Sequence, residues 1–429
     1  MLIEFSVQNY LSFKNPVTFT MVASSVRRHA ENNVFPVTRK LSLLKSAVIY
    51  GANASGKTNL FQAMHFMKDL VRNSSKATQV GEKIDAAPFR LSTETENMPS
   101  VFEIIFIRDG IRYRYGFEAD HSKIHNEWLF YVPGAKETKL FVREDGVFEI
   151  GTHFTEGKGL ESKTRDNALF LSVAAQFNGE ISKAVLKWFG NFNIISGFGE
   201  YGDITTEYME KGETSAGKIG EFLKVADLGI EAVNIDKAEA GTNIPKSPGI
   251  PKTARDVLIS KETDIKTLHQ KYDRNKKIVG FENFGLKENE SKGAQKIFSL
   301  AGPILNTLSG SEVLVADEMD AGLHPLITKF IIQLFNSEEN NPNNAQLIFN
   351  THTTNVLDRN LFRRDQIWFT EKDRYGSTDL YSLLDYKVKN SASYGKDYIL
   401  GRYGAIPYID TDEFRSLISS VGNEGKTDG

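Results

Sequence analysis

The sequence predicts an α/β protein with a mixed, mainly parallel central sheet, an antiparallel β-subdomain and an inserted helical lobe. Three short apolar segments, 46–50, 313–316 and 346–350, have the length and composition of buried strands. Each is followed or preceded by apolar residues at helical spacing. Strands that alternate with helices are typical of parallel sheets whose two faces are both covered.

Composition sets outer limits on function. The chain has 429 residues, a formal net charge of -3 and no cysteine, which excludes disulfides, thiolate metal ligands and a cysteine nucleophile. No long apolar segment predicts a membrane span, and the N-terminal residues read as a strand rather than a signal peptide. We therefore expect a cytoplasmic protein without a membrane partner.

The first part, residues 1–155, is expected to contain the β-subdomain. Alternating apolar residues predict strands at 2–7 and 17–21. The segments 101–107 and 111–118 flank a short Arg-Asp-Gly turn and predict a hairpin, and a second hairpin is expected to turn at 144–146. Leu60, Met64, Met67 and Val71 lie on one face of a predicted helix that follows the strand at 46–50.

The middle part, residues 156–289, is more polar and is predicted to form the inserted helical lobe. Amphipathic stripes around Ile181 and Ile219 indicate helices, whereas 238–252 is rich in Pro and Gly and reads as a mobile loop. The last part, 290–429, returns to alternating strands and helices and is expected to end in a frayed tail.

The most informative motif follows the strand at 46–50. Gly51-Ala-Asn-Ala-Ser-Gly56-Lys57-Thr58 fits the pattern GxxxxGK[ST] between a strand and a helix. Such a loop turns its N–H groups around phosphate oxygens, and the following helix presents its positive end. Lys57 would reach the β- and γ-phosphates, and the Thr58 hydroxyl would bind Mg²⁺. The expected ATP-binding residues are Gly51, Asn53, Ala54, Ser55, Gly56, Lys57, Thr58 and Asn59.

A second motif, Val313-Leu-Val-Ala-Asp317-Glu318, places two carboxylates at the carboxyl end of an apolar strand. Ligands bind at this end of strands in open α/β sheets. Asp317 would hold the Mg²⁺ shell together with Thr58, while Glu318 would orient and polarise the attacking water.

The spacing of the two motifs indicates which class of P-loop protein the sequence resembles. About 260 residues separate Lys57 from Asp317, and this separation resembles the ABC/SMC/RecF class, in which a long insertion divides the nucleotide site. The opening residues, Phe5 to Phe13, are similar to the first strand and turn of RecF- and SMC-like heads. The resemblance implies an ABC-type ATPase head.

Three further segments resemble parts of that class. Glu290-Ser291-Lys292-Gly293 looks like a degenerate ABC signature, which implies that Ser291 and Gly293 contact the nucleotide of a second subunit. Asp320 lies where a D-loop residue would meet the partner, and His352 follows a strand as the switch histidine does. Ser291 also fits an ordinary helix N-cap. The sequence does not identify the Q-loop glutamine, for which Gln79 and Gln176 are candidates by position only. His324 is interpreted as structural.

Nearly the whole chain resembles the stand-alone ABC-like ATPases of bacterial antiviral defence, the RloA/AbiLi type, which are related to the ATPase half of OLD proteins. The segments 87–91, 113–117 and 394–407 support this resemblance. OLD proteins carry a C-terminal Toprim nuclease, and only about 77 residues follow His352. The resemblance therefore implies a homo-oligomeric ATP-operated switch with a separate effector nuclease or toxin.

Two alternatives remain at this stage. A RecF-like DNA repair ATPase would need a phosphate-binding surface, for which Lys271, Arg274, Lys276 and Lys277, with Tyr272 among them, form the densest basic cluster. Such a run is more often plain solvated surface. The other alternative is a scaffold that binds ATP with little turnover. The presence of Glu318, the residue expected to orient the attacking water, counts against it.

Overall fold

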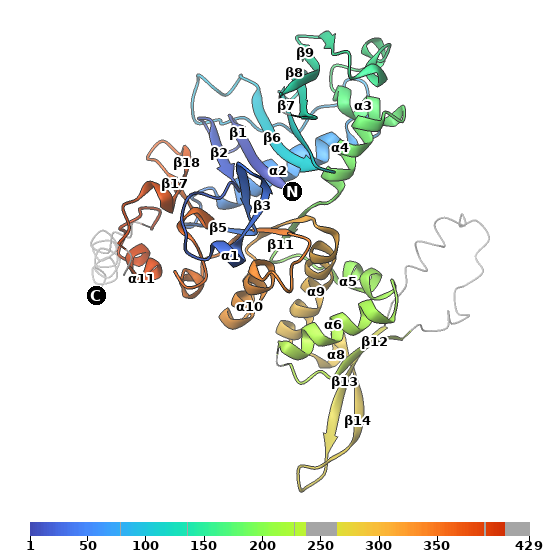
Figure 1. Cartoon of the computed structure of the whole chain (residues 1–429), viewed down its shortest axis with the longest axis vertical. Coiled ribbons are helices and arrows are strands. Elements are labelled where there is room, and N and C mark those ends of the chain that lie inside the picture. The colour runs from blue at the N-terminus through green and yellow to red at the C-terminus, as the bar shows by residue number, and fades with distance from the viewer. Residues whose placement is uncertain (78, 135, 227, 237–263, 390–391, 408–429) are drawn as a thin grey trace, which may run out of the picture.

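The computed structural model describes residues 1–77, 79–134, 136–226, 228–236, 264–389 and 392–407. The loop expected at 238–252 and the C-terminal tail lie outside these ranges. Two large sheets lie side by side in Figure 1, and a smaller lobe that carries a long hairpin extends from the body.

The central sheet has six strands in the order β11-β15-β16-β5-β17-β18, and neighbours are parallel except for the β17–β18 pair. Its strands are β5 (Ser46–Gly51), β11 (Phe192–Ser196), β15 (Val313–Asp317), β16 (Gln346–Asn350), β17 (Ile367–Lys372) and β18 (Thr378–Ser382). The apolar runs at 46–50, 313–316 and 346–350 are thus confirmed as neighbouring buried strands.

The second sheet is antiparallel and has the order β10-β9-β8-β7-β6-β1-β2. Its strands are β1 (Leu2–Gln8), β2 (Val17–Thr20), β6 (Ser100–Arg108), β7 (Ile111–Ala119), β8 (Ile124–Val132), β9 (Thr138–Glu144) and β10 (Val147–Ile150). Both predicted hairpins are present. Gln346, at the start of β16, joins the two sheets because its side-chain amide bonds both the N–H and the carbonyl of Leu2.

Both faces of the central sheet are covered, which explains the unbroken apolar character of its strands. In β5, Ala47 and Ile49 pack into the core shared with the antiparallel sheet, whereas Val48 and Tyr50 pack into the opposite core. The first core also contains α2 (Lys57–Asn73), α3 (Phe170–Gln176) and α4 (Glu180–Gly190). The second contains α5 (Gly202–Met209), α6 (Glu213–Val225), α9 (Lys292–Gly310), α10 (Pro325–Asn336) and α11 (Tyr394–Ile399). The short α1 (Ala30–Asn33) precedes the small pair β3 (Val34–Thr38) and β4 (Leu41–Leu44).

The middle part differs from the single helical lobe expected at 156–289. α3 and α4 pack on the antiparallel sheet and β11 is an edge strand of the central sheet, because their apolar faces complete cores begun by other segments. The projecting lobe begins at α5 and includes a three-stranded sheet of β12 (Ala232–Asp236), β13 (Asp264–Tyr272) and β14 (Ile278–Gly285), followed by α8 (Leu286–Asn289). β13 is mostly half-buried and β14 is mostly exposed, so neither strand has the regular burial periodicity that would reveal it in the sequence.

Candidate functional site

The predicted phosphate-binding loop, hereafter the P-loop, connects β5 to α2. Gly56 has φ 110°, a backbone conformation that strongly favours glycine. A Cβ at this position would lie 2.4 Å from the Thr378 hydroxyl oxygen, so the turn is also packed too closely for a side chain. Ser55, Gly56 and Lys57 are buried, whereas Asn53 and Ala54 at the tip of the loop are exposed.

The Lys57 amine folds back onto the P-loop itself. Its Nζ donates hydrogen bonds to the carbonyls of Gly51 at 2.8 Å and Ala52 at 3.0 Å. Burial lowers the pKa of Lys57 to about 8, and the nearby carboxylates of Glu318 and Asp317 only partly oppose this effect. A polyanion in the loop would supply the negative charge that this buried cation lacks.

Thr58 and Asp317 meet although they are distant in sequence. The Thr58 hydroxyl donates to Asp317 Oδ1 at 3.2 Å, which brings together two oxygen donors of the kind that Mg²⁺ binds through one or two protein ligands plus phosphate and water. The residues present therefore fit a Mg²⁺–nucleotide complex.

Asn350, at the carboxyl end of β16, was not predicted as a site residue. Its side-chain amide donates to Asp317 Oδ1, and its side-chain carbonyl accepts from the Glu318 backbone N–H. One buried amide thus orients the first carboxylate and fixes the backbone of the second, whose φ is 52°. A polar residue at the end of a buried strand beside the acidic strand is the signal that could have identified it.

Gly197, directly after β11, supports the same carboxylates. Its N–H bonds the Asp317 carbonyl at 2.5 Å, and a Cβ there would lie 1.8 Å from the Glu318 carbonyl oxygen. The loop 197–201 after β11 occupies the entry to the lobe, where the Q-loop was expected, and it contains no glutamine. Gln79 lies in an exposed segment after α2 and Gln176 ends α3, so neither occupies that position.

His352 follows β16 at the same edge of the sheet. Its side chain is exposed, but partial desolvation and the positive charge of Lys57 lower its pKa, while Glu318, Asp320 and Asp317 oppose the shift. The imidazole is therefore neutral at neutral pH. Asp320 accepts a hydrogen bond of 2.5 Å from the Thr353 hydroxyl, and this bond holds the predicted D-loop beside His352.

A second polar network, also missed in the sequence, supports the back of the P-loop. The Thr378 hydroxyl lies 2.8 Å from the Ser55 carbonyl and 2.7 Å from the Ser12 hydroxyl. Ser12 also accepts from the Asn59 amide at 2.6 Å, and the Ser55 and Thr370 hydroxyls share a bond of 2.6 Å. The loop is thus held by the β1–β2 turn and by β17–β18.

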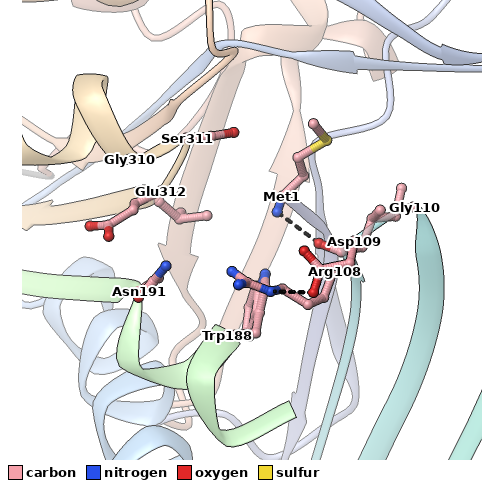
Figure 2. Close-up of a pocket in the computed structure, with 11 residues that line it drawn as sticks. Met1, Arg108, Asp109, Gly110, Trp188, Asn191, Gly310, Ser311 and Glu312 are labelled. Carbon is pink, nitrogen blue, oxygen red and sulfur yellow. Dashed lines mark hydrogen bonds and ion pairs between the residues drawn. The ribbon is translucent and has the colours of Figure 1, made fainter. Parts of the chain in front are cut away.

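The described residues also line cavities outside this cluster. A hollow of about 570 Å³ lined by Lys14, Phe89 and Tyr375, among others, borders the P-loop through Ser377, the neighbour of Thr378. A cavity of about 390 Å³ lies between Arg108, Trp188 and Glu312 (Figure 2). Glu312 and Asn191 precede β15 and β11, so this cavity is at the amino ends of the parallel strands, opposite the P-loop.

The predicted signature residues lie apart from the P-loop. Ser291 is exposed, and its hydroxyl caps α9 by accepting from the Ala294 N–H at 3.1 Å. Figure 1 places this start of α9 beside α8 in the lobe, away from β5 and α2. The single chain therefore does not bring Ser291 and Gly293 to Lys57. His324 caps α10 by accepting from the Leu326 N–H at 3.3 Å, in agreement with its structural interpretation.

Comparison with known proteins identifies the family. A family model described as "AAA domain, putative AbiEii toxin, Type IV TA system" matches residues 46–358, which is most of the chain and includes the whole cluster from Gly51 to His352. The chain belongs to that family. It is a P-loop protein of the ATPase class, as the sequence predicted.

Solved structures with related shapes are SMC heads. The SMC head domain from Thermotoga maritima aligns with a TM-score of 0.39 and 13% identity over 89% of this chain and 98% of that chain. The Smc head domain with an extended coiled coil bound to the C-terminal domain of ScpA, derived from Pyrococcus furiosus, gives 0.40 and 12% over 94% and 98%. A search of curated proteins gave no match. Among the described residues, no helix is long and apolar enough to cross a membrane.

Proposed function

We propose that this AAA-domain protein binds Mg²⁺-ATP and hydrolyses it in a site shared between two copies of the chain. The observation that carries the proposal is the convergence of Lys57, Thr58, Asp317, Glu318 and Asn350 at the carboxyl ends of β5, β15 and β16. Side chains of these types, placed around a P-loop, can position a triphosphate and a water for in-line attack.

Each residue then has a distinct role. Lys57 would leave the Gly51 and Ala52 carbonyls to bind the β- and γ-phosphates. Thr58 and Asp317 would hold Mg²⁺, which would supply positive charge to the phosphate oxygens. Glu318 orients the water that attacks the γ-phosphorus as the bond to ADP breaks, giving ADP and phosphate. Asn350 keeps both acids in place. The neutral His352 donates a hydrogen bond to the γ-phosphate.

A second copy completes the site. Ser291 and Gly293 are exposed or half-exposed at the amino end of α9, where helix N–H groups and a hydroxyl can bind an anion. Because they lie away from Lys57 of their own chain, we propose that they contact the nucleotide bound by a facing copy, together with Asp320. ATP would then favour the closed dimer and hydrolysis would reopen it.

The biological role follows from family likeness. The description of the matched family names a putative toxin of a type IV toxin–antitoxin system. The sequence also resembles antiviral defence ATPases. We propose that the ATP-dependent dimer regulates a separate effector nuclease or toxin in an anti-phage response.

The test compares wild-type protein with Glu318→Gln and with Glu339→Gln, which changes an exposed carboxylate after α10. We expect Glu318→Gln to lower turnover by about 100-fold or more, and to increase the dimer fraction with Mg²⁺-ATP in light scattering. Glu339→Gln should behave as wild type. Unchanged turnover in Glu318→Gln, or a mass that ATP never alters in either protein, would overturn the proposed mechanism.

A further inference from the structure

The hairpin β13–β14 carries large apolar side chains in solvent. Figure 1 shows it extending from the lobe, away from both large sheets. Lys271 pairs with Gly280 and Tyr272 with Ile278, so Val279 is an extra residue in a β-bulge. Tyr272, Ile278 and Val279 are 56%, 54% and 62% exposed. Bulges turn an edge strand away from pairing with another strand, so this tip is not built for sheet extension.

The turn of the hairpin also carries unpaired positive charge. Arg274, Lys276 and Lys277 are exposed, and no carboxylate in the described part of the chain forms an ion pair with them. Asp273, which precedes Arg274 in the turn, accepts the backbone N–H groups of Asn275 and Lys277 at 2.8 Å each. In contrast, Lys271 lower on the hairpin is paired with Glu282 at 2.7 Å. Cations are thus left free only where the hairpin ends.

We propose that this tip binds double-helical DNA, with Arg274, Lys276 and Lys277 on the phosphates and Tyr272, Ile278 and Val279 against the groove. A two-stranded ribbon fits the major groove of B-form DNA, where apolar side chains can contact the methyl groups of thymine. The deep, narrow major groove of A-form RNA does not admit a ribbon. The overall charge of -3 does not oppose a local contact of this kind, since screening limits its range to about 10 Å.

The base of the arm is tied to the predicted signature. Thr267 and His269 of β13 both bond the Glu290 carboxylate, at 2.5 and 2.6 Å, and Glu290 directly precedes Ser291. The Gln295 side chain of α9 donates to the Glu290 carbonyl at 3.0 Å. A movement of the hairpin β13–β14 would therefore be transmitted through Glu290 to Ser291, the residue that would contact the partner's nucleotide. This coupling step, unlike DNA binding itself, rests on the proposed function.

Binding is tested by fluorescence anisotropy with a duplex of about 30 base pairs at several salt concentrations. The variant Arg274→Gln/Lys276→Gln/Lys277→Gln should bind at least tenfold more weakly. Its salt slope should fall by about 2.7, since each phosphate contact contributes about 0.9. The control Arg39→Gln/Lys40→Gln/Lys83→Gln makes the same charge change at exposed positions elsewhere and should match wild type. No wild-type binding at low salt, or equal losses in both triple variants, would overturn the proposal.

The apolar contribution has its own control. Ile278→Ser/Val279→Ser should weaken duplex binding several-fold with an unchanged salt slope, whereas Val147→Ser, at an exposed position of another hairpin, should have no effect. Polyglutamate and an RNA duplex serve as competing probes. If polyglutamate displaces the DNA as well as unlabelled duplex does, the tip is a site for an acidic protein instead. If RNA binds through the tip more tightly than DNA, the groove argument is wrong.

Coupling is tested with His269→Phe, which keeps an aromatic ring beside Phe284 but removes the bond to Glu290. We expect duplex DNA to raise wild-type turnover by about fivefold or more, and His269→Phe to bind DNA normally without that response. If Glu318→Gln still dimerises with ATP but the tip variants bind DNA as wild type does, the DNA-binding proposal is wrong and the ATP-dependent dimer is retained. If instead the tip variants lose DNA binding but ATP does not change the dimer fraction of Glu318→Gln, the DNA-binding proposal is retained and the ATP-dependent dimer is wrong.

Discussion

The two halves of the proposed nucleotide site are built differently. The P-loop half is internal: Ser55, Gly56 and Lys57 are buried, and segments more than 300 residues away in the sequence hold them. The α9 half is on the surface, and the Ser291 hydroxyl accepts its hydrogen bond from the first turn of its own helix. All residues of the first half converge in one chain, whereas in the proposed mechanism the second half would bind nucleotide only when another copy faces it. We infer that nucleotide affinity resides mainly in the first half and control in the second.

The largest expected effect comes from removing the cation of the internal half. Lys57→Ala should abolish the rise in melting temperature that ATP produces, because the triphosphate loses its buried partner. At about 100 times Kd this stabilisation is about 2.7 kcal/mol, which is measurable by calorimetry. Lys68→Ala, on the same helix α2, should keep the response. If Lys57→Ala still responds fully to ATP, the nucleotide does not bind at the P-loop.

A sharper test separates the two halves. Ser291→Asp should preserve the cap of α9, since Asp caps helices about as well as Ser, but it places a carboxylate against the partner's phosphates. We expect unchanged thermal stability, ATP binding within a few-fold of wild type, and turnover lower by about tenfold or more. If Ser291 only caps its helix, turnover will be that of wild type.

Mixing two variants tests whether the P-loop half and the α9 half of one site come from different chains, without relying on a single substitution. A dimer of one Lys57→Ala chain and one Ser291→Asp chain contains one site that is wild type in both halves. Mixed samples should recover about a quarter of wild-type turnover in a symmetric two-site dimer, which is more than either variant is expected to show alone. Failure of the mixture to exceed the sum of the separate samples would show that both halves act within one chain.

The network behind the P-loop should have a smaller effect. Thr378→Val removes a hydroxyl that contacts both Ser55 and Ser12 and leaves the shape unchanged. We expect a loss of about 1–3 kcal/mol in unfolding free energy and weaker ATP binding. Thr18→Val, which removes an exposed hydroxyl paired with Ser6, is the control. Equal, small losses in both variants would mean that the network does not shape the loop.

The sequence predicted the parts of the site that are determined by local residue patterns. The P-loop, the strand ending at Asp317 and the strand before His352 are contiguous in sequence, and their buried strands and helical faces have clear periods. Their convergence follows because the carboxyl ends of parallel strands share one edge of the sheet. The family match over 46–358 confirms the ATPase class on independent grounds.

Contacts between distant segments were not predictable in the same way. Thr378 and Ser12 are ordinary polar residues until the fold places them beside Ser55. Asn350 is polar in an apolar run, but its partners lie on another strand. The sheet β12–β14 was missed because β13 is mostly half-buried and β14 is mostly exposed, so no regular alternation of buried and exposed residues marks them. The two glutamines considered for the Q-loop, Gln79 and Gln176, lie near the ends of α2 and α3, whereas β11 leads into the lobe.

The smallest predicted effect is a proton that accompanies ATP binding. Burial lowers the pKa of Lys57 to about 8 in the free chain, so the amine is charged below pH 8 and increasingly neutral above it. A bound triphosphate favours the ammonium and raises that pKa. Binding should therefore take up almost no proton near pH 7 and a growing fraction of one proton toward pH 9, as measured by calorimetry in buffers of different ionisation enthalpy. Lys57→Arg stays charged throughout this range and should take up none. His352 cannot mimic the effect, since its lowered pKa leaves it neutral well below this window. Binding at pH 9 without proton uptake would mean that burial does not lower the pKa of the Lys57 amine in the free chain.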